Sequence, residues 1–442
     1  MLVVACMLKG WKTYSWDIDS AFLHGFLKEE IYMRAPSGYD DPAGKGKVFK
    51  LKKTLYGLKQ AAAEWHLLLA STLRDIGYKA ADASDCLWVK QEPTGETCIV
   101  CHHVEDCAVG SSCDKMAADL KAVLKDKFGL SDGGSLTWHL GMNVRIVPKV
   151  SAHISQRPYI EAMLTKFGMG DCKTASTPMS DTTRVDKADC PEVVDEALRL
   201  EYMQKVGSVM YAAHMTRPDI AFACSQLGGV LQNPGPEHMK AVNRVLRYLA
   251  GTLDRGLSYS NKVWNIPGVD KAISPSELAC FTDADWAGDC SDRLSTSCYL
   301  SYLAGGVVSY KMVKQKVHAM SSAESELISL SSGARDAEYI RNTLKALGVL
   351  VQAKATNIYT DSSSALAISE KSGMNDKTKH IQLRYYQVRK LRADQVVLPV
   401  KIGTDYNPSD VGTKALGLIT FARHRDAVVS DGPIARTWAS RV

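Results

Sequence analysis

The sequence has no long apolar segment and no regular spacing of cysteines. No apolar run approaches the roughly 18 residues of a membrane-spanning helix, so we expect no membrane partner. The twelve cysteines are scattered without the spacing of a disulfide framework. That scatter favours a reducing compartment and therefore an intracellular protein, cytoplasmic or nuclear. The chain also has no internal repeat and no low-complexity tract, so neither a repeat array nor a biased linker is expected.

What remains is the composition of an ordinary globular protein. At 442 residues the chain is too long for one hydrophobic core, and usual domain sizes suggest about two to four domains. Apolar residues make up 45% and charged residues 23%, which favours folding over disorder. The net charge of +6 permits nucleic-acid binding without requiring it, because a local basic patch matters more than the total.

One group of cysteines and histidines could be interpreted as a zinc site: Cys98, Cys101, His102, His103, Cys107 and Cys113. The segment from Cys98 to Cys101 has the pattern of a strand, however. Residues three apart on a strand point to opposite faces, which argues against a shared metal.

The first part of the chain alternates short strand-like runs with helical stretches. "WKTYSWDIDSAFL" at 11–23 predicts a strand that enters a helix. "ETCIVCHHVEDCAV" at 96–109 predicts a β-hairpin with its acidic pair at the bend. "AAAEWHLLLASTLRDIGY" at 61–78 predicts a helix whose apolar residues share one face: Trp65, Leu68, Leu69, Leu73 and Ile76.

The rest of the chain changes character at residues 259–278, a stretch rich in turn formers where we place a domain boundary. Before it the pattern is mainly helical, and "PEHMKAVNRVLRYLAGT" at 236–252 predicts a helix that Gly251 terminates. After it come strand-like runs, a long helix, a strand, helices, a strand and a final short helix. The strands are expected at 278–282, 297–303, 307–312, 356–360 and 396–401, with a further candidate at 317–320. This order predicts an α+β / α/β multidomain protein with a mixed sheet in its last part.

Acidic residues recur at the ends of these later elements. Asp283 and Asp361 follow strands, Glu326 lies in the first turns of the long helix, and Asp410 is placed at the start of the last helix. Each one alone could be a helix cap, and that alternative stays open. If the strands before Asp283 and Asp361 are neighbours, the four carboxylates crowd together and only cations can relieve their repulsion. Two Mg²⁺ or Mn²⁺ ions about 4 Å apart would then catalyse phosphodiester hydrolysis.

Several motifs in this region resemble the RNase H domain of copia-type (Ty1/copia) retrotransposon polyproteins. The motifs are "FTDADWAGD" at 281–289, "AMSSAESELISL" at 319–330, "YTDSSSAL" at 359–366, "TKHIQLRYYQVRK" at 378–390 and "TDYNPSDVGTKAL" at 404–416. They occur in the family's order and roughly at its spacing. The resemblance implies hydrolysis of the RNA strand of an RNA–DNA hybrid, with Asp283, Glu326, Asp361 and Asp410 as catalytic metal ligands.

Two of these assignments involve a choice between neighbours. Asp283 and Asp285 share a strand face, and the family pattern favours Asp283. Glu324 and Glu326 lie about 200° apart around a helix, so only one can face the site. Glu326 shares a helical stripe with the apolar residues Leu330, Ala337 and Leu344, and it is the predicted ligand.

The segment Lys377–Arg392 carries six Lys or Arg and no acidic residue, with two adjacent tyrosines. One interpretation is a solvated helix face that covers the aromatic rings. The other is a surface that follows the phosphates of the hybrid. The residues predicted to bind nucleic acid are Lys377, Lys379, His380, Arg384, Arg389 and Lys390.

The first half resembles the reverse transcriptase of the same elements. Its matching stretches are "WDIDSAFLHGFLKEEIYMRAPSGY" at 16–39, "LKKTLYGLKQAAAEW" at 51–65, "HVED" at 103–106, "WHLGMNV" at 138–144, and three runs at 159–179, 206–223 and 238–252. The resemblance implies a partial reverse-transcriptase palm at 1–150 and a mainly helical thumb/connection at 151–260. An RNase H-like mixed-sheet domain at 275–418 and a C-terminal tail at 419–442 would follow.

By the same resemblance, Asp17 and Asp106 would hold two metals that position a primer 3′-hydroxyl and an incoming nucleotide. Phe22 matches a position that crowds the ribose 2′-hydroxyl, although a plain core aromatic is an equal alternative. Gln60 lies in the motif that lines the nucleotide pocket.

Departures from the family pattern predict an impaired polymerase. The usual Tyr-Val-Asp-Asp turn is His-Val-Glu-Asp here, and the predicted catalytic residue Glu105 is one methylene longer than aspartate. A misplacement of about 1 Å can lower a rate roughly 10²-fold. The chain also starts just before Asp17, so we expect the N-terminal fingers to be absent.

The sequence therefore predicts an RNA-directed DNA polymerase / ribonuclease H type segment with a working nuclease and a weakened polymerase. The expected cofactor is Mg²⁺ or Mn²⁺. The expected partners are an RNA–DNA hybrid, an RNA template with its DNA primer, dNTPs if the polymerase is active, and the rest of a Pol polyprotein. The alternative is a catalytically silent nucleic-acid-binding relic or domesticated protein.

Overall fold

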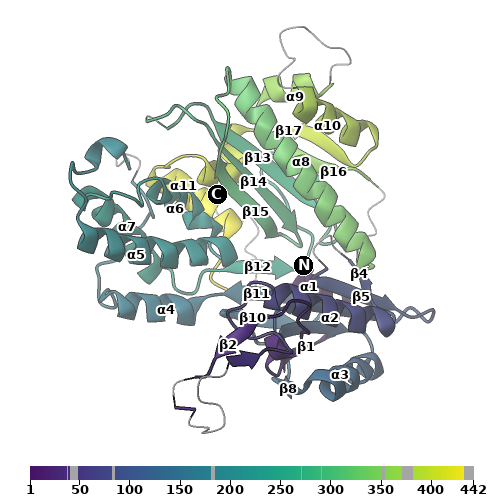
Figure 1. Ribbon diagram of the computed structural model, residues 1–442. Helices are drawn as coiled ribbons and strands as arrows, with labels where there is room; N and C mark the ends of the chain where they lie inside the picture. Colours follow the sequence, from purple (N-terminus) through teal and green to yellow (C-terminus); the bar gives the residue numbers. More distant parts are fainter. Residues whose placement is uncertain are drawn as a thin grey trace. The chain divides into compact units, whose positions relative to one another are not determined.

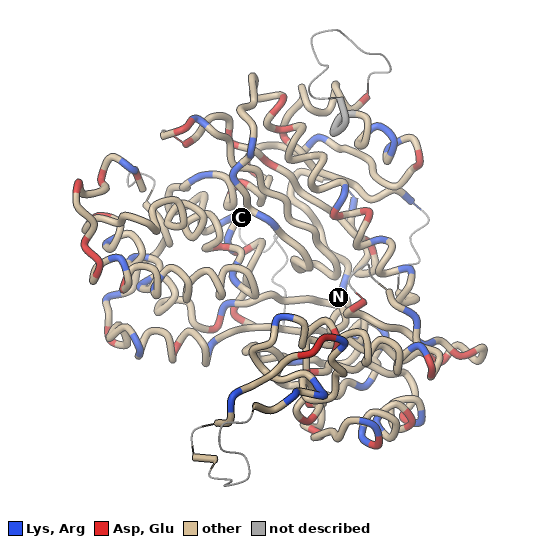
Figure 2. Tube along the Cα trace, viewed as in Figure 1, with Lys and Arg blue, Asp and Glu red and all other residues tan. Residues whose placement is uncertain are grey.

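The structure is a computed structural model, and it describes residues 1–36, 38–39, 48–81, 85–180, 185–269, 271–289, 291–349, 354–370 and 382–432. The chain divides into two compact units. The smaller unit is Leu2 with Lys9–Leu140, and the larger unit is Met1, Val3–Leu8 and Gly141–Val442. Basic and acidic residues are interspersed over both units (Figure 2). Among the described residues, none of the helices combines the length and the apolar character that a bilayer crossing requires.

The smaller unit is built on a six-stranded sheet of order β4-β5-β6-β7-β1-β8. Its helices α2 and α3 supply one side of a core that contains Trp16, Trp65 and Leu124. The elements are β1 (Lys12–Ile18), η1 (Ala21–Leu23), β2 (Tyr32–Arg34), β3 (Val48–Lys50), α2 (Ala61–Asp75), β4 (Lys79–Ala80), β5 (Leu87–Gln91), β6 (Thr97–His103), β7 (Asp106–Ser111), α3 (Asp114–Phe128), β8 (Leu130–Asp132) and β9 (Trp138–His139).

The larger unit begins with a helical region around a short antiparallel sheet in which β11 lies between β10 and β12. Its elements are α1 (Leu2–Lys9, shared with the smaller unit at Leu2 and Lys9), β10 (Met142–Val147), β11 (Ser151–Ser155), α4 (Arg157–Lys166), η3 (Lys187–Asp189), α5 (Glu196–Met215), η4 (Pro218–Ile220), α6 (Ala221–Gly228), α7 (Pro236–Ala250) and β12 (Leu257–Ser260).

A five-stranded mixed sheet of order β15-β14-β13-β16-β17 forms the rest of the larger unit. Helix α8 runs across β13 and β14 (Figure 1). The elements are β13 (Ala279–Asp285), β14 (Thr296–Leu303), β15 (Gly306–Lys314), α8 (Ser322–Ala346), β16 (Thr356–Thr360), α9 (Ser363–Glu370), α10 (Gln382–Ala393), β17 (Val397–Lys401), η6 (Thr404–Tyr406), η7 (Pro408–Gly412) and α11 (Leu418–Val428).

Most of the predicted elements are present. The mixed α/β architecture is confirmed, and so are the hairpin at 96–109, the helix on 61–78 and the five expected strands of the mixed sheet. Trp65, Leu69 and Leu73 are buried on α2, as the helical spacing predicts. The domain limits drawn from the sequence stay a prediction. Within the predicted tail at 419–442, helix α11 packs through buried Phe421, His424 and Val428.

Three local predictions are wrong. The candidate strand at 317–320 is not a strand; instead the backbone N–H of Met320 donates to the Glu324 carboxylate (2.8 Å), so this segment caps helix α8. The strand at 12–18 leads into only one turn of 3₁₀ helix, η1. Asp410 lies in the 3₁₀ segment η7, and the last helix begins only at Leu418 because the segment between them turns around Thr413.

Candidate metal-binding active sites

Two of the predicted carboxylates lie at one edge of the mixed sheet. Strands β13 and β16 pair in parallel, with Thr282 opposite Thr360. The carboxyl ends of parallel neighbours meet at the same edge. Asp283 and Asp361, the residues that follow this last pair, therefore lie next to each other. Asp283 is almost fully buried, whereas Asp361 is half-buried.

Helix α8 brings Glu326 to this edge because the helix lies very close to the strands. A Cβ atom on Gly333 would lie only 2.6 Å from Thr282 Cγ2, so a residue without a side chain is needed there. One turn after Glu326, the Ser329 hydroxyl lies 2.7 Å from the Asp283 carbonyl and 2.8 Å from the Cys298 carbonyl. These contacts fix the rotation of the helix, and with it the direction of Glu326.

Glu324 has a different task at the start of the same helix. The Ser321 hydroxyl accepts a hydrogen bond from the Glu324 N–H (3.2 Å), while the Glu324 carboxylate accepts one from Met320. This reciprocal arrangement is close to a capping box, which satisfies N–H groups that the helix leaves free. The two neighbouring glutamates are thus separated into a capping residue and a residue that faces the sheet edge.

Carboxylate oxygens of Asp283, Glu326 and Asp361 all lie within 4.8 Å of one another. Oxygens at such distances, from three separate elements, match the donor set that hard divalent cations prefer. Glu326 Oε2 is buried and has no hydrogen-bond partner among the described residues. An unsatisfied buried carboxylate oxygen is costly, and a cation beside it would remove that cost. The residues present therefore fit a divalent metal.

Asp410 reaches the same cluster from η7. The Asn407 amide ties this segment to β13 by donating to the Thr282 carbonyl (3.0 Å). Lys414 Nζ lies 3.0 Å from Asp410 Oδ1 and 4.0 Å from Asp283 Oδ2. Thr413 donates its hydroxyl proton to Asp283 Oδ2. A buried acidic residue, a cation and a hydroxyl thus converge on Asp283.

The electrostatics of this cluster follow from burial and mutual repulsion. Burial, with the charges of Asp283 and Asp361 beside it, raises the pKa of Glu326 to about 9. Burial and Asp283 raise the pKa of Asp410 to about 8, although Lys414 opposes the shift. The pKa of Asp361 is also raised by burial and by Asp283. Without a cation, the cluster therefore holds protons at neutral pH.

Asp285, the alternative to Asp283, lies beside this cluster but has another partner. Its carboxylate accepts the backbone N–H of Thr296, the residue opposite it on β14. Burial raises the pKa of Asp285 to about 6. Its carboxylate is not among the three that share the 4.8 Å cluster.

The basic segment can be placed only in part. Lys377, Lys379 and His380 lie outside the described residues, and so does the side chain of Arg384. Arg389 is half-buried and Lys390 is exposed on α10, a helix that contacts α8, α9 and β17. The hybrid-binding surface predicted there stays a prediction.

In the smaller unit, Asp17 and Asp106 lie directly opposite each other on β1 and β7. Side chains of directly opposed residues in an antiparallel pair have Cβ atoms about 4.5–5.5 Å apart. Burial, followed by the charges of Asp106 and Asp19, raises the pKa of Asp17. Two carboxylates from distant parts of the sequence therefore share one place on the sheet.

Glu105 lies in the tight turn between β6 and β7, beside this pair. Val104 adopts φ +57°, a conformation that a β-branched residue rarely takes. The Trp65 indole N–H holds the turn by donating to the Val104 carbonyl (2.9 Å). The Tyr56 hydroxyl donates to Glu105 Oε2 (3.4 Å). The longer glutamate side chain is thus turned toward a tyrosine that sequence reasoning did not single out.

Of the two predicted nucleotide-binding residues, Phe22 lies beside Tyr56 and Gln60 directly precedes α2. The rings of Phe22 and Tyr56 are in contact, with centroids 5.0 Å apart. Phe22 is half-buried against the core, so it has one side available. The Gln60 amide donates to Glu29 Oε2 (3.3 Å) just before α2. Their roles at a nucleotide stay predictions.

The cysteines and histidines of the proposed zinc alternative do not form a donor cluster among the residues that the structure describes. Cys98 is buried inside the strand β6, where Tyr78 and Ser111 are hydrogen-bonding neighbours of its thiol. Burial raises the pKa of the Cys107 thiol. The thiolate form that binds zinc is therefore disfavoured.

Comparison with known proteins extends the likeness over nearly the whole chain. Residues 1–181 match the family model "Reverse transcriptase (RNA-dependent DNA polymerase)". The Pol polyprotein of transposon TNT 1-94 from Nicotiana tabacum is 35% identical over 404 residues, which are 90% of this chain and 29% of that protein. The Pol polyprotein of transposon RE1 from Arabidopsis thaliana is 30% identical over 414 residues, 93% of this chain and 27% of that protein.

These matches support a copia-type retrotransposon Pol segment. This Pol segment spans less than a third of the length of the two relatives. A solved structure, LC11-RNase H1 in complex with RNA/DNA hybrid, aligns with 31% of this chain and 94% of its own at 10% identity and a TM-score of 0.24.

Within this Pol segment, the structure brings Asp283, Glu326, Asp361 and Asp410 together in the larger unit, and Asp17 with Asp106 in the smaller unit. Sequence reasoning missed Lys414 and Thr413, which contact the cluster, and Tyr56, which contacts Glu105. The only signal in the sequence was the closeness of Lys414 to Asp410, four residues apart, and the pairing of the two follows from the turn at Thr413.

Proposed function

We propose that the larger unit cleaves the RNA strand of an RNA–DNA hybrid with two divalent cations, Mg²⁺ or Mn²⁺. The observation that carries this proposal is the clustering of Asp283, Glu326 and Asp361 oxygens within 4.8 Å. Asp410 would be the fourth metal-holding residue. Bound there, the cations would activate a water molecule and stabilise the departing oxygen.

The chain's own side chains prepare this site for its substrate. Ser329 and Asn407 fix the strand and helix that carry the carboxylates. Lys414 is 43% exposed, so its ammonium group can leave Asp410 for a phosphate of the hybrid once cations occupy the cluster. The buried oxygens of Glu326 and Asp410 must lose their protons before they can serve as ligands.

The direct test is cleavage by the full chain of a hybrid that carries a label on its RNA strand. We expect cleavage of the RNA in the hybrid with Mg²⁺ or Mn²⁺, and neither cleavage of double-stranded DNA nor cleavage after chelation. Binding of the hybrid without turnover in either metal would instead support the catalytically silent alternative.

We propose a weakened RNA-directed DNA polymerase as a second function, in the smaller unit. The observation that favours it is the direct opposition of Asp17 and Asp106 on neighbouring strands. An RNA template, a DNA primer and dNTPs would be its substrates. Two carboxylates are the usual minimum for a pair of metal ions that positions triphosphate and primer.

Shortening Glu105 is expected to improve this polymerase. In Glu105→Asp the carboxylate withdraws from Tyr56 toward the turn, and primer extension should rise about 10-fold, less than the roughly 10²-fold that a 1 Å misplacement can cost. Single-nucleotide extension on an RNA template measures it. Tyr56→Phe, which removes only the hydroxyl, is the control for the lost contact. Equal rates in the parent and Glu105→Asp would show that Glu105 is not the cause of any weakness.

A further inference from the structure

Asp410 differs from the other three acidic residues in how its backbone is supported. Asp283 lies in strand β13, Asp361 directly follows strand β16, and Glu326 lies on a 25-residue helix. Asp410 lies in η7, a five-residue 3₁₀ segment. Such short segments have few internal hydrogen bonds and depend on their neighbours for their position.

The neighbours of η7 come from two sides. Strands β13 and β14 contact it from the sheet. From the other side it contacts α11 and two elements of the helical region, η4 and α6. Both η4 and α6 precede residue 275, where the predicted nuclease domain (275–418) begins. Part of the support of Asp410 is therefore supplied by residues that the sequence assigns to the thumb/connection.

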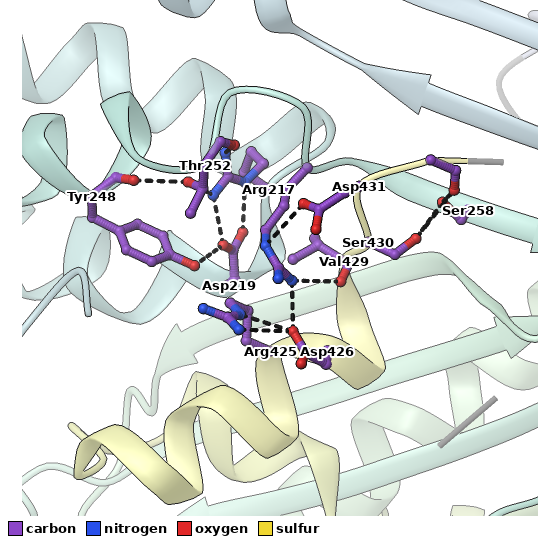
Figure 3. A network of polar contacts seen from close by, with 12 residues as sticks. Arg217, Asp219, Tyr248, Thr252, Ser258, Arg425, Asp426, Val429, Ser430 and Asp431 are labelled. Atoms are coloured by element: carbon purple, nitrogen blue, oxygen red, sulfur yellow. Dashed lines mark hydrogen bonds and ion pairs between the residues drawn. The ribbon is translucent and has the colours of Figure 1, made fainter. Parts of the chain in front are cut away.

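Element η4 is held by a buried ion pair, seen from close by in Figure 3. Arg217 Nε donates to Asp219 Oδ1 (2.9 Å) and Arg217 Nη2 to Asp219 Oδ2 (2.8 Å). Both side chains have an exposed fraction of 0%. The guanidinium also donates to the Thr252 carbonyl (2.9 Å) and hydroxyl (2.7 Å), and the Tyr248 hydroxyl donates to Asp219 Oδ2 (2.6 Å).

The same network reaches helix α11, which packs on η7. The Tyr248 ring meets Phe421 of α11 edge-on, with centroids 5.7 Å apart. Arg255 donates to Asp426 Oδ1 (2.7 Å) at the end of α11 and to the Val429 carbonyl (3.2 Å). Tyr248 thus touches both supports of η7, because its hydroxyl contacts Asp219 of η4 and its ring contacts α11.

We infer that the Arg217–Asp219–Tyr248 network is a positioning device for Asp410. This inference rests on the proposed nuclease function and extends its machinery into the helical region. None of the three residues touches the acidic cluster, and they act through η4 and α11. A bidentate pair whose guanidinium also makes two hydrogen bonds to Thr252 has one geometry, so it holds η4 in one place.

Removal of the Tyr248 hydroxyl tests this without exposing a buried charge. Tyr248→Phe keeps the ring contact with Phe421 and the Arg217–Asp219 pair, but it releases one of the bonds that hold Asp219. The matched control is Tyr259→Phe, because the Tyr259 hydroxyl is also buried and donates to a carbonyl, that of Val307 (2.7 Å). Tyr259 lies on β12, which packs against the mixed sheet at β15.

The measurement is the Mn²⁺ dissociation constant of the folded full chain, followed by the electron paramagnetic resonance signal of free Mn²⁺. We expect Tyr248→Phe to weaken Mn²⁺ binding on the order of 10-fold, the lower end of what changes behind metal ligands usually cause. Tyr259→Phe should stay within about 2-fold of the parent, although both variants lose one buried hydrogen bond and comparable thermal stability.

Equal Mn²⁺ affinity in Tyr248→Phe and Tyr259→Phe would overturn the inference and leave the nuclease proposal standing. A parent chain that binds no Mn²⁺ and cleaves no hybrid would remove both. If Tyr248→Phe does not fold at the assay temperature, Arg255→Gln releases the α11 support instead. The same weakening of Mn²⁺ binding is then expected, and its absence would overturn the inference.

Discussion

Replacing Asp283 with asparagine is expected to lower the rate of hybrid cleavage by about 10³-fold or more. The metal ions of a phosphodiester hydrolase supply several kcal/mol of transition-state stabilisation, and about 1.4 kcal/mol corresponds to each factor of ten. Asp283 is the residue on which the cluster converges, since Glu326, Asp361, Asp410 and Lys414 all interact with it. The neutral amide removes the charge while it keeps the size of the side chain.

The matched control for this variant is Asp336→Asn. Asp336 lies on the same helix as Glu326, and it is a largely buried carboxylate that accepts hydrogen bonds from Ser301 (2.6 Å) and Ser309 (2.8 Å). Asp336 is not one of the carboxylates of the acidic cluster. Single-turnover cleavage should therefore stay within a few-fold of the parent in Asp336→Asn. Full activity of Asp283→Asn would show that the cluster is not the catalytic site.

Removal of Asp219 is expected to have the largest effect on stability. In Asp219→Ala the Arg217 guanidinium stays buried at 0% exposure with no carboxylate to pair with. Breaking one partner of a buried pair usually costs about 3–5 kcal/mol, because an uncompensated charge is left behind. Denaturant unfolding of the full chain, followed through the transition of the larger unit, measures this free energy of unfolding.

An exposed ion pair of the same unit gives the comparison. Asp405 is 85% exposed and lies 3.7 Å from Arg423, and such surface pairs usually contribute about 0–1 kcal/mol. Asp405→Ala should therefore hardly change the unfolding midpoint. If Asp219→Ala costs no more than Asp405→Ala, the buried network does not stabilise the fold.

Local patterns in the sequence were sufficient for the strands and for the helical side of the site. The 3.6-residue period placed Glu326 on the stripe of Leu330, Ala337 and Leu344 and set Glu324 apart from it. In the structure Glu326 lies beside Asp283 and Asp361, and Glu324 caps the helix. Alternation and turn formers located the β6–β7 hairpin with Glu105 in its turn. These features are determined by residues that are close in the sequence, so sequence patterns can predict them.

Features that depend on distant contacts could not be predicted in this way. Arg217 and Asp219 lie two residues apart and resemble an exposed turn, since charged residues are mostly on the surface. Their burial depends on Tyr248 and Thr252, which the fold alone brings near. The 3₁₀ conformation around Asp410 is likewise set by the elements that pack on η7 rather than by its own sequence.

We expect folding to gather the four distant carboxylates around divalent cations, and Mn²⁺ titration calorimetry of the full chain measures whether they bind such ions. Binding requires deprotonated ligands, and the pKa values of Glu326 and Asp410 are raised to about 9 and about 8. Affinity should therefore rise with pH from 6 to 9, and protons should be released at pH 7, seen as a heat that depends on the buffer. We expect saturable binding, and we expect Asp283→Asn to remove the sites of the larger unit while binding at Asp17 and Asp106 is kept. Weak binding that is the same in parent and variant, with no proton release, would contradict this expectation.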